Sequence, residues 1–236
     1  MTTKVAFIIP IKNEESSIEN TYFFKTMLNS IVKTVNFDKY TIFIYLGYNT
    51  GDILGRQKNQ DALKENFKCF NFDFFQFDNF VEKGHLTLMW NMLFDKAYFD
   101  DCEYMYQCGD DLKFFSENWL DDSVKILKEN NNIGISGPSN NNNTLLTQAL
   151  VHKTHKKIFG HFLDSKNIKN YYLDDWLNLI YSPGYVYVLH DHYCSNDLKP
   201  PRYTIDFSME KIKISVEEHK FILNDYIKVY FPKWKK

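Results

Sequence analysis

The sequence predicts an α/β fold, in which a mostly parallel sheet is flanked by helices in a single domain. Strand-like apolar runs and helix-like segments alternate four times in the first half of the chain, which is typical of parallel strands joined by crossover helices. The 236 residues suit one such domain, and 44% of them are apolar while 25% are charged, the balance of a folded globular protein. The alternation of strand-like and helix-like segments becomes less regular near residue 138. This change divides the domain 1–236 into a regular half, 1–137, and a less regular half, 138–236.

In the regular half, short apolar runs bounded by turn residues predict the strands, and segments with apolar residues at helical spacing predict the helices. The strands are expected at residues 5–9, 41–46, 70–77, 103–108 and 133–136. The helices are expected after a cap at Ser16 or Ser17 as far as Val35, over 54–67, from Gly84 to Ala97, and over 119–130.

The second half is predicted to hold shorter elements. Strands are expected over 144–151 and 185–190, and short helices over 154–162 and 174–181. The run Ser215-Val216-Glu217-Glu218 matches a capping box and predicts that a last helix begins there.

Charge and cysteine content exclude several classes of protein. A net charge of −2 without an extended basic region argues against nucleic acid as a partner. The four cysteines form no CxxC pair, which predicts reduced thiols rather than disulfides or a zinc site. We expect a cytoplasmic protein, because no signal peptide and no apolar run long enough for a transmembrane helix are found. The sequence leaves open whether the chain forms a homo-oligomer.

An acidic pair, Gly109-Asp110-Asp111, follows the fourth predicted strand. Ligands of open α/β sheets lie beyond the carboxyl ends of the strands, and adjacent carboxylates there suit a hard divalent cation such as Mn²⁺ or Mg²⁺ that bridges a diphosphate. A solvated acidic turn would give the same pattern. His190 and His192, which follow the strand predicted at 185–190, are candidates for a further metal ligand, although a histidine in a strand is more often structural.

A second acidic pair, Asp174-Asp175, precedes Trp176 at the start of a predicted helix. Asp174 is expected to cap this helix, which leaves Asp175 free to act as a general base beside an aromatic ring. Simple capping with Trp176 packed in the core explains the pattern equally well. The motifs GxGxxG, Walker A, HExxH and GxSxG are missing, which disfavours dehydrogenases, P-loop enzymes, zinc peptidases and serine hydrolases.

Taken in order along residues 4–190, these motifs resemble those of the family-2-type glycosyltransferases of the GT-A fold. The resemblance rests on Val5–Glu15, on Gly84 through Trp90-Asn91 to Ala97, on Tyr104–Asp111 followed by Trp119-Leu120, and on Leu173–Trp176. The chain departs from the family pattern at three points: the second strand ends in Leu46-Gly47 rather than an acidic pair, Trp90 stands in place of an arginine, and the DxD-like motif at 108–111 lacks one acidic residue.

The resemblance implies a hexosyltransferase-type enzyme that moves a sugar from a nucleoside-diphosphate sugar, with UDP favoured, to a hydroxyl of a glycan, protein or small-molecule acceptor. It implies a metal-dependent, inverting reaction in which residues 1–137 hold the donor and 138–236 face the acceptor. The residues implied to hold the nucleoside and diphosphate are Pro10, Ile11, Lys12, Asn13, Glu14, Asp52, Asn91 and Asp110. Mn²⁺ or Mg²⁺ would be bound by Asp110 and Asp111 with His190 or His192, and the acceptor would be deprotonated by Asp175, beside Asp174.

Two other classes of function stay open. A carbohydrate- or nucleotide-binding module of the same fold would keep these motifs without turnover. A nucleotidyltransferase also uses carboxylates and a metal, but it usually has a glycine-rich loop after the first strand, and the loop Lys12–Glu15 contains no glycine.

Overall fold

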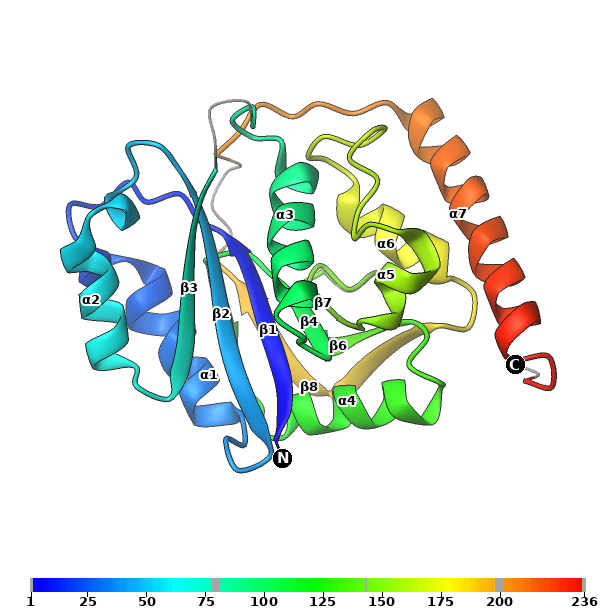
Figure 1. Ribbon diagram of the computed structural model, residues 1–236, viewed down its shortest axis with the longest axis horizontal. Coiled ribbons are helices and arrows are strands. Elements are labelled where there is room, and N and C mark those ends of the chain that lie inside the picture. Colours follow the sequence, from blue (N-terminus) through cyan, green and yellow to red (C-terminus); the bar gives the residue numbers. More distant parts are fainter. Residues whose placement is uncertain (1, 78–80, 143, 198–201, 235–236) are drawn as a thin grey trace.

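The computed structural model describes residues 2–77, 81–142, 144–197 and 202–234, which form an eight-stranded mixed sheet with helices on both faces (Figure 1). The strand order is β3-β2-β1-β4-β7-β6-β8-β5. The strands are β1 (Thr3–Pro10), β2 (Tyr40–Asn49), β3 (Phe70–Phe77), β4 (Tyr104–Gln107), β5 (Leu112–Phe114), β6 (Ile135–Ser139), β7 (Ala149–His152) and β8 (Val186–Asn196). The helices are α1 (Leu28–Thr34), α2 (Gln57–Asn66), α3 (Leu86–Phe99), α4 (Trp119–Glu129), α5 (Thr154–Phe159), α6 (Leu173–Tyr181) and α7 (Met209–Tyr230).

The first four strands form the parallel part of the sheet, as the sequence predicts. β1 pairs in parallel with β2 and β4, and β2 pairs in parallel with β3. Residues 5–9 of β1 are fully buried, because helices cover both faces. Alternate side chains of β1 enter two cores: Phe7 packs with residues of α1, α2 and α4, whereas Ile8 packs with residues of α3, α6 and α7.

The first predicted helix is broken into three pieces. A 3-10 turn at Ile18–Asn20 and a π-helical turn at Phe23–Met27 precede α1, and neither turn is capped by a serine side chain. Thr21 lies between the two turns, where its hydroxyl donates to the Ile18 carbonyl and accepts from the Phe24 amide. Such side-chain bonds compete with regular helix hydrogen bonds, which explains why one long helix does not form.

The second half of the sheet is antiparallel or mixed. β7 runs antiparallel to β4 and β6, and β8 runs parallel to β6 but antiparallel to β5. The short strand β5 was not predicted, because its pairing partner lies about eighty residues further along the chain. β8 also continues six residues beyond its predicted end at residue 190.

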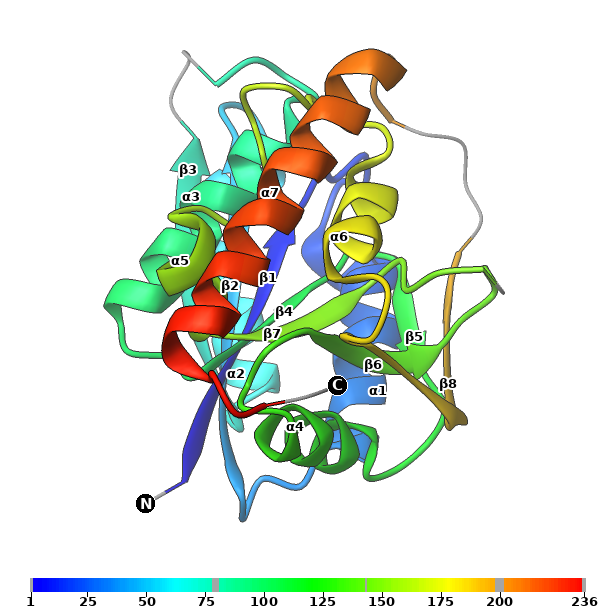
Figure 2. The ribbon, with the colours of Figure 1, turned by 90° about the vertical axis from the view of Figure 1, so that its right-hand side faces the viewer.

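The last helix begins at Met209, so the prediction of a capping box at Ser215 is wrong. Ser208 caps α7 by accepting a hydrogen bond from the Lys211 amide. Ser215 lies buried inside the helix, where its hydroxyl accepts from Trp176 Nε1 at 2.8 Å and donates to Asp164 Oδ2 at 2.5 Å. The bond from Trp176 ties α7 to α6, and the two helices lie side by side in Figure 2. Ser215, the first residue of the predicted capping box, therefore makes tertiary hydrogen bonds instead of capping a helix.

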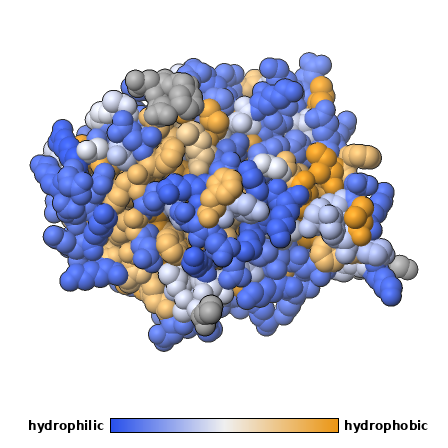
Figure 3. Space-filling model, in the orientation of Figure 1, coloured by the Kyte–Doolittle hydropathy of each residue, from blue (hydrophilic) through white to orange (hydrophobic). Residues whose placement is uncertain are grey.

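The surface agrees with a folded domain whose core lies between its layers. The face seen in Figure 3 is largely hydrophilic, with apolar side chains gathered over the β3 side of the sheet and on α7. The exposed apolar side chains of α7 include Ile214, Phe221 and Val229. All four cysteines are free, as predicted, and three of them are buried. Among the described residues, no helix combines the length and apolar character needed to cross a membrane.

Candidate functional site

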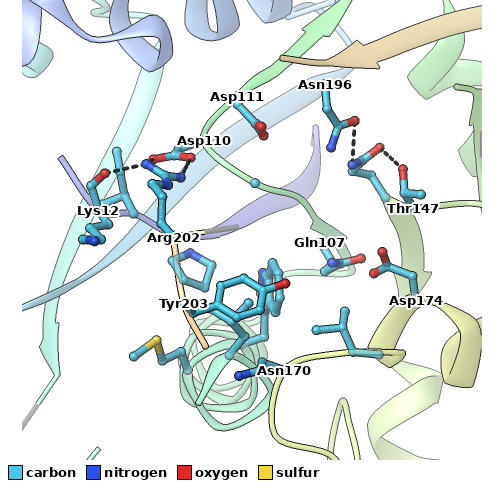
Figure 4. A pocket seen from close by; sticks show the side chains of 18 of the residues that line it. Lys12, Gln107, Asp110, Asp111, Thr147, Asn170, Asp174, Asn196, Arg202 and Tyr203 are labelled. Atoms are coloured by element: carbon cyan, nitrogen blue, oxygen red, sulfur yellow. Dashed lines mark hydrogen bonds and ion pairs between the residues drawn. The ribbon is translucent and has the colours of Figure 1, made fainter. Parts of the chain in front are cut away.

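A cavity of about 650 Å³ opens at the carboxyl ends of β1 and β4 (Figure 4). Three segments that the sequence analysis singled out meet in it: the loop after β1, the turn between β4 and β5, and the start of α6. A fourth segment, which includes Arg202 and Tyr203, lines the cavity and was not predicted. The position agrees with the rule that ligands of open α/β sheets bind beyond the carboxyl ends of the strands.

The loop Pro10–Glu14 lines the cavity and is held in place by Asp52. The Asp52 carboxylate accepts hydrogen bonds from the Asn13 backbone amide at 2.8 Å and from the Asn13 side chain at 2.7 Å. It also accepts from the Leu54 amide at 2.9 Å, which caps the 3-10 turn Ile53–Gly55. Asp52 is not among the lining residues, and its contact with the site runs through Asn13 of the loop.

Asp110 is buried in the wall of the cavity, where its carboxylate pairs with the side chain of Arg202. The guanidinium of Arg202 makes a bidentate ion pair with its carboxylate, and one of the two nitrogens lies 3.1 Å from Asp110 Oδ2. The same guanidinium donates to the Lys12 carbonyl at 2.6 Å. Arg202 thus joins two of the predicted motifs.

Asp111 lies beside Asp110 in the same wall. Burial, and then the charge of Asp110, raise the pKa of Asp111 to about 6. Two adjacent carboxylates completed by water and substrate oxygens are the donor set that Mg²⁺ commonly uses, so these residues fit a hard divalent cation. Among the described residues, no cluster of three or more His, Cys, Asp or Glu side chains has metal-binding geometry, so any cation here would rely on non-protein ligands as well.

The second acidic pair lies at the start of α6, but Asp174 does not cap the helix. The residue at the cap position is Tyr172, which adopts a left-handed φ of 63° and makes no side-chain cap bond. Asp174 is instead in the first turn and its carboxyl group points into the cavity toward Gln107 (Figure 4). Asp174 Oδ1 is buried and has no hydrogen-bond partner among the described residues.

Burial and the neighbouring charge of Asp175 raise the pKa of Asp174 to about 8, although a side-chain hydrogen bond with Gln107 opposes the shift. Asp174 therefore holds its proton at neutral pH. Asp175 lines the cavity as well and is partly exposed. The cavity wall thus carries a protonated carboxyl group beside a second, partly exposed one.

The histidine predictions are contradicted by the structure. His192 Nε2 lies 2.8 Å from Asp122 Oδ2 of α4, His190 is exposed, and neither side chain lines the cavity. The reason is the length of β8: the strand continues to Asn196, so Asn196 rather than a histidine reaches the cavity. Its side chain accepts a hydrogen bond from Gln148 Nε2 at 2.9 Å.

Asn91 also lies away from the cavity, which corrects its predicted place near the diphosphate. Its buried amide donates to the Leu163 carbonyl at 2.8 Å and accepts from the backbone amides of Phe162 and Leu163. Asn91 therefore fixes the segment after α5 against α3. Trp90, its neighbour, does line the cavity and donates through its indole nitrogen to the Ile8 carbonyl.

Gln107 and Arg202 are among the cavity residues that the sequence analysis missed. Gln107 is a polar residue at the end of an otherwise apolar strand, which is a recognisable signal. Arg202 is one of only two arginines in the chain, but it follows no motif, and its partner Asp110 is 92 residues away. The described lining residues carry six carboxyl groups against two basic side chains, so the cavity is strongly acidic: Glu14, Glu15, Asp110, Asp111, Asp174 and Asp175 oppose Lys12 and Arg202.

The architecture matches solved structures of TarS from S. aureus. TarS 1–349 in complex with UDP-GlcNAc matches with a TM-score of 0.59 and 14% identity, covering 98% of this chain and 73% of that chain. The same fragment in complex with UDP gives a TM-score of 0.56, 15% identity and coverages of 98% and 72%. The fold is a GT-A fold.

A longer TarS structure gives a TM-score of 0.57 and 12% identity. The match covers 96% of this chain but only 40% of that TarS chain. No model of a known protein family and no curated protein sequence matches the chain. The resemblance to GT-A glycosyltransferases predicted from the motifs is thus confirmed as a likeness of fold.

Proposed function

We propose that the protein is a glycosyltransferase that moves a sugar from a nucleoside-diphosphate sugar, with UDP favoured, to an acceptor hydroxyl. The observation that carries the proposal is that Pro10–Glu14, Asp110-Asp111 and Asp174-Asp175, far apart in the chain, line one cavity at the carboxyl ends of a GT-A sheet. The likeness to TarS structures with bound UDP-GlcNAc and UDP supports this class of donor.

The donor diphosphate would be bound with a divalent cation. Carboxyl groups outnumber basic side chains in the cavity even with Asp174 protonated, so a diphosphate would be repelled unless further positive charge entered with it. Asp110 and Asp111 would hold Mn²⁺ or Mg²⁺, and the bound cation would neutralise the charge that develops on the departing nucleoside diphosphate. The loop Pro10–Glu14 would hold the nucleoside, in the position that Asp52 fixes.

Asp175 would remove the proton from the acceptor hydroxyl in a direct, inverting displacement. Asp174 is the neutral member of the pair at pH 7, because burial and the charge of Asp175 raise its pKa to about 8. Asp175 is then the carboxylate available as a base at the cavity wall. Asp174 and Gln107, which form a side-chain hydrogen bond, would line the cavity between Asp175 and the end of β4.

The test is to incubate the protein with a panel of nucleotide sugars and Mn²⁺ and to measure free nucleoside diphosphate, with and without candidate acceptors. Release that depends on one donor supports the proposal. Donor binding without any release favours a binding module of the same fold. Release of pyrophosphate from a nucleoside triphosphate and a sugar phosphate would indicate a nucleotidyltransferase.

A further inference from the structure

The segment 202–208 precedes α7, and its first residues, Arg202 and Tyr203, line the cavity while Asn170 holds the residues that follow. The buried side chain of Asn170 donates to the carbonyls of Gly84 and Thr204, both at 2.9 Å, and accepts from the Asp206 amide at 3.0 Å. Tyr203 packs so closely on Gly84 that its Cβ lies 2.9 Å from where a side-chain carbon would begin. The backbone beside Arg202 is therefore fixed, while the side chain of Arg202 extends beyond the last anchor into the cavity.

Arg202 binds the carboxylate of Asp110, which a divalent cation would need as a ligand. Its guanidinium engages both oxygens of Asp110 and also the Lys12 carbonyl, although 38% of its side chain remains exposed. A guanidinium and a metal ion cannot both take the oxygens of one carboxylate that is only 8% exposed. Binding of a cation to Asp110 must therefore release at least one of the hydrogen bonds of Arg202.

We propose that Arg202 is an exchangeable counter-ion, which neutralises Asp110 in the empty site and moves to the donor's diphosphate when a divalent cation takes Asp110. This inference rests on the proposed function. The planar fork of a guanidinium matches phosphate oxygens as well as it matches a carboxylate, so the released side chain finds a second bidentate partner within the same cavity. Since the backbone is held by Asn170, a rotation of the side chain is enough for the exchange.

The exchange couples the two ligands. A cation alone must displace Arg202 without compensation, and a diphosphate alone meets an acidic cavity. When both bind, Arg202 moves from the Asp110 carboxylate to the diphosphate and keeps an anionic partner. Each ligand therefore strengthens the binding of the other, and by the same factor. Such coupling typically amounts to about 5–150-fold in affinity.

The experiment compares the parent protein with Arg202→Gln, using Mn²⁺ alone, UDP alone and the two together. Free Mn²⁺ is followed by electron paramagnetic resonance, and UDP binding is followed by calorimetry. Arg202→Gln should bind Mn²⁺ alone more tightly than the parent, by about 5-fold or more, yet bind UDP in the presence of Mn²⁺ more weakly. Arg202→Lys, which keeps the charge but loses the fork, should lie between the two proteins.

Arg56→Gln is the matched control, because Arg56 is the other arginine of the chain, is exposed and lies outside the cavity. It should leave both affinities unchanged. If Arg202→Gln binds Mn²⁺ alone no better than the parent, or binds UDP with Mn²⁺ equally well, the exchange is refuted while the proposed function stands. If the parent binds UDP as tightly in EDTA as in Mn²⁺ and Arg202→Gln abolishes that binding, Arg202 replaces the metal and the exchange is again refuted. If the parent binds neither ligand, the proposed function fails together with this inference.

Discussion

Two Asp–Asp dipeptides face the same cavity, and their surroundings differ. Asp110-Asp111 lies at the end of β4, where the guanidinium of Arg202 neutralises Asp110 and the pKa of Asp111 rises to about 6. Asp174-Asp175 lies in the first turn of α6, where Asp174 has a hydrogen bond with the neutral amide of Gln107 and its pKa rises to about 8. Because its partner is the guanidinium of Arg202, the first pair can exchange that cation for a divalent metal ion. In the second pair the partner is a neutral amide, and Asp174 is held in its protonated form.

The largest expected effect is on the second pair. Asp175→Asn removes the proposed base with little change of shape, so turnover should fall by about 10²–10⁴-fold while UDP affinity in Mn²⁺ stays the same. Asp174→Asn is the matched control, and it should cost far less because Asn resembles the protonated acid. Turnover is measured as release of UDP in the presence of donor and acceptor. Near-full activity of Asp175→Asn, or a product that keeps the anomeric configuration of the donor, would show that Asp175 is not this base.

The next effect concerns the first pair. Asp111→Asn removes one of two proposed cation ligands, so the affinity for Mn²⁺ in the presence of UDP should fall at least about tenfold, equivalent to about 1.4 kcal/mol. Asp122→Asn, a substitution on α4 outside the cavity, is the control and should leave the Mn²⁺ affinity unchanged. Unchanged Mn²⁺ affinity in Asp111→Asn would mean that the two acidic pairs do not differ in the way proposed.

The protonation of Asp174 predicts how stability depends on pH. Its pKa is raised in the folded state from 3.8 to about 8, so the folded protein holds a proton that the unfolded chain loses above about pH 4. This contribution to stability is complete below pH 4 and is lost as the pH rises through 8, by up to about 1.4 kcal/mol for each pH unit. Compared with the parent, Asp174→Asn should therefore gain in melting temperature as the pH increases from 5 to 8. A difference that is equal at both pH values would contradict the assignment of the proton.

The smallest effect is expected from the histidine that the sequence placed at the metal. His192 pairs with Asp122 in a partly exposed position, and such pairs contribute up to about 1 kcal/mol to stability. His192→Ala should therefore lower stability slightly and leave Mn²⁺ affinity unchanged. A clear loss of Mn²⁺ affinity would restore His192 as a ligand and would contradict the structure.

Much of the regular half of the fold follows from its sequence. The apolar run at 5–9 is buried on both faces, and the strand predicted at 70–77 has these bounds in the structure. The four parallel strands β1 to β4 are predicted by their own residues. Other elements depend on distant partners: β5 pairs with the end of β8, and Ser215 forms a hydrogen bond with Trp176 of α6 rather than beginning α7. Local patterns contain no information about such partners.

The site divides in the same way. The acidic pairs and the loop after β1 are contiguous motifs, and the topology brings them together as predicted. Arg202, Gln107 and Asn196 enter the cavity only through tertiary structure. The histidines were misplaced because the end of β8 could not be located from the alternation of its residues: six more residues of strand carry the chain past His190 and His192 before it reaches the cavity.

The central claim is that this cavity binds a nucleoside diphosphate together with a divalent cation. The most direct test is a calorimetric titration of the parent protein with UDP, once in Mn²⁺ and once in EDTA. The account predicts binding that is at least about tenfold tighter in Mn²⁺, because the ionised carboxylates of the cavity outnumber its two basic side chains and repel the diphosphate unless a cation joins it. Equal affinity in the two titrations, or no binding in either, would contradict it.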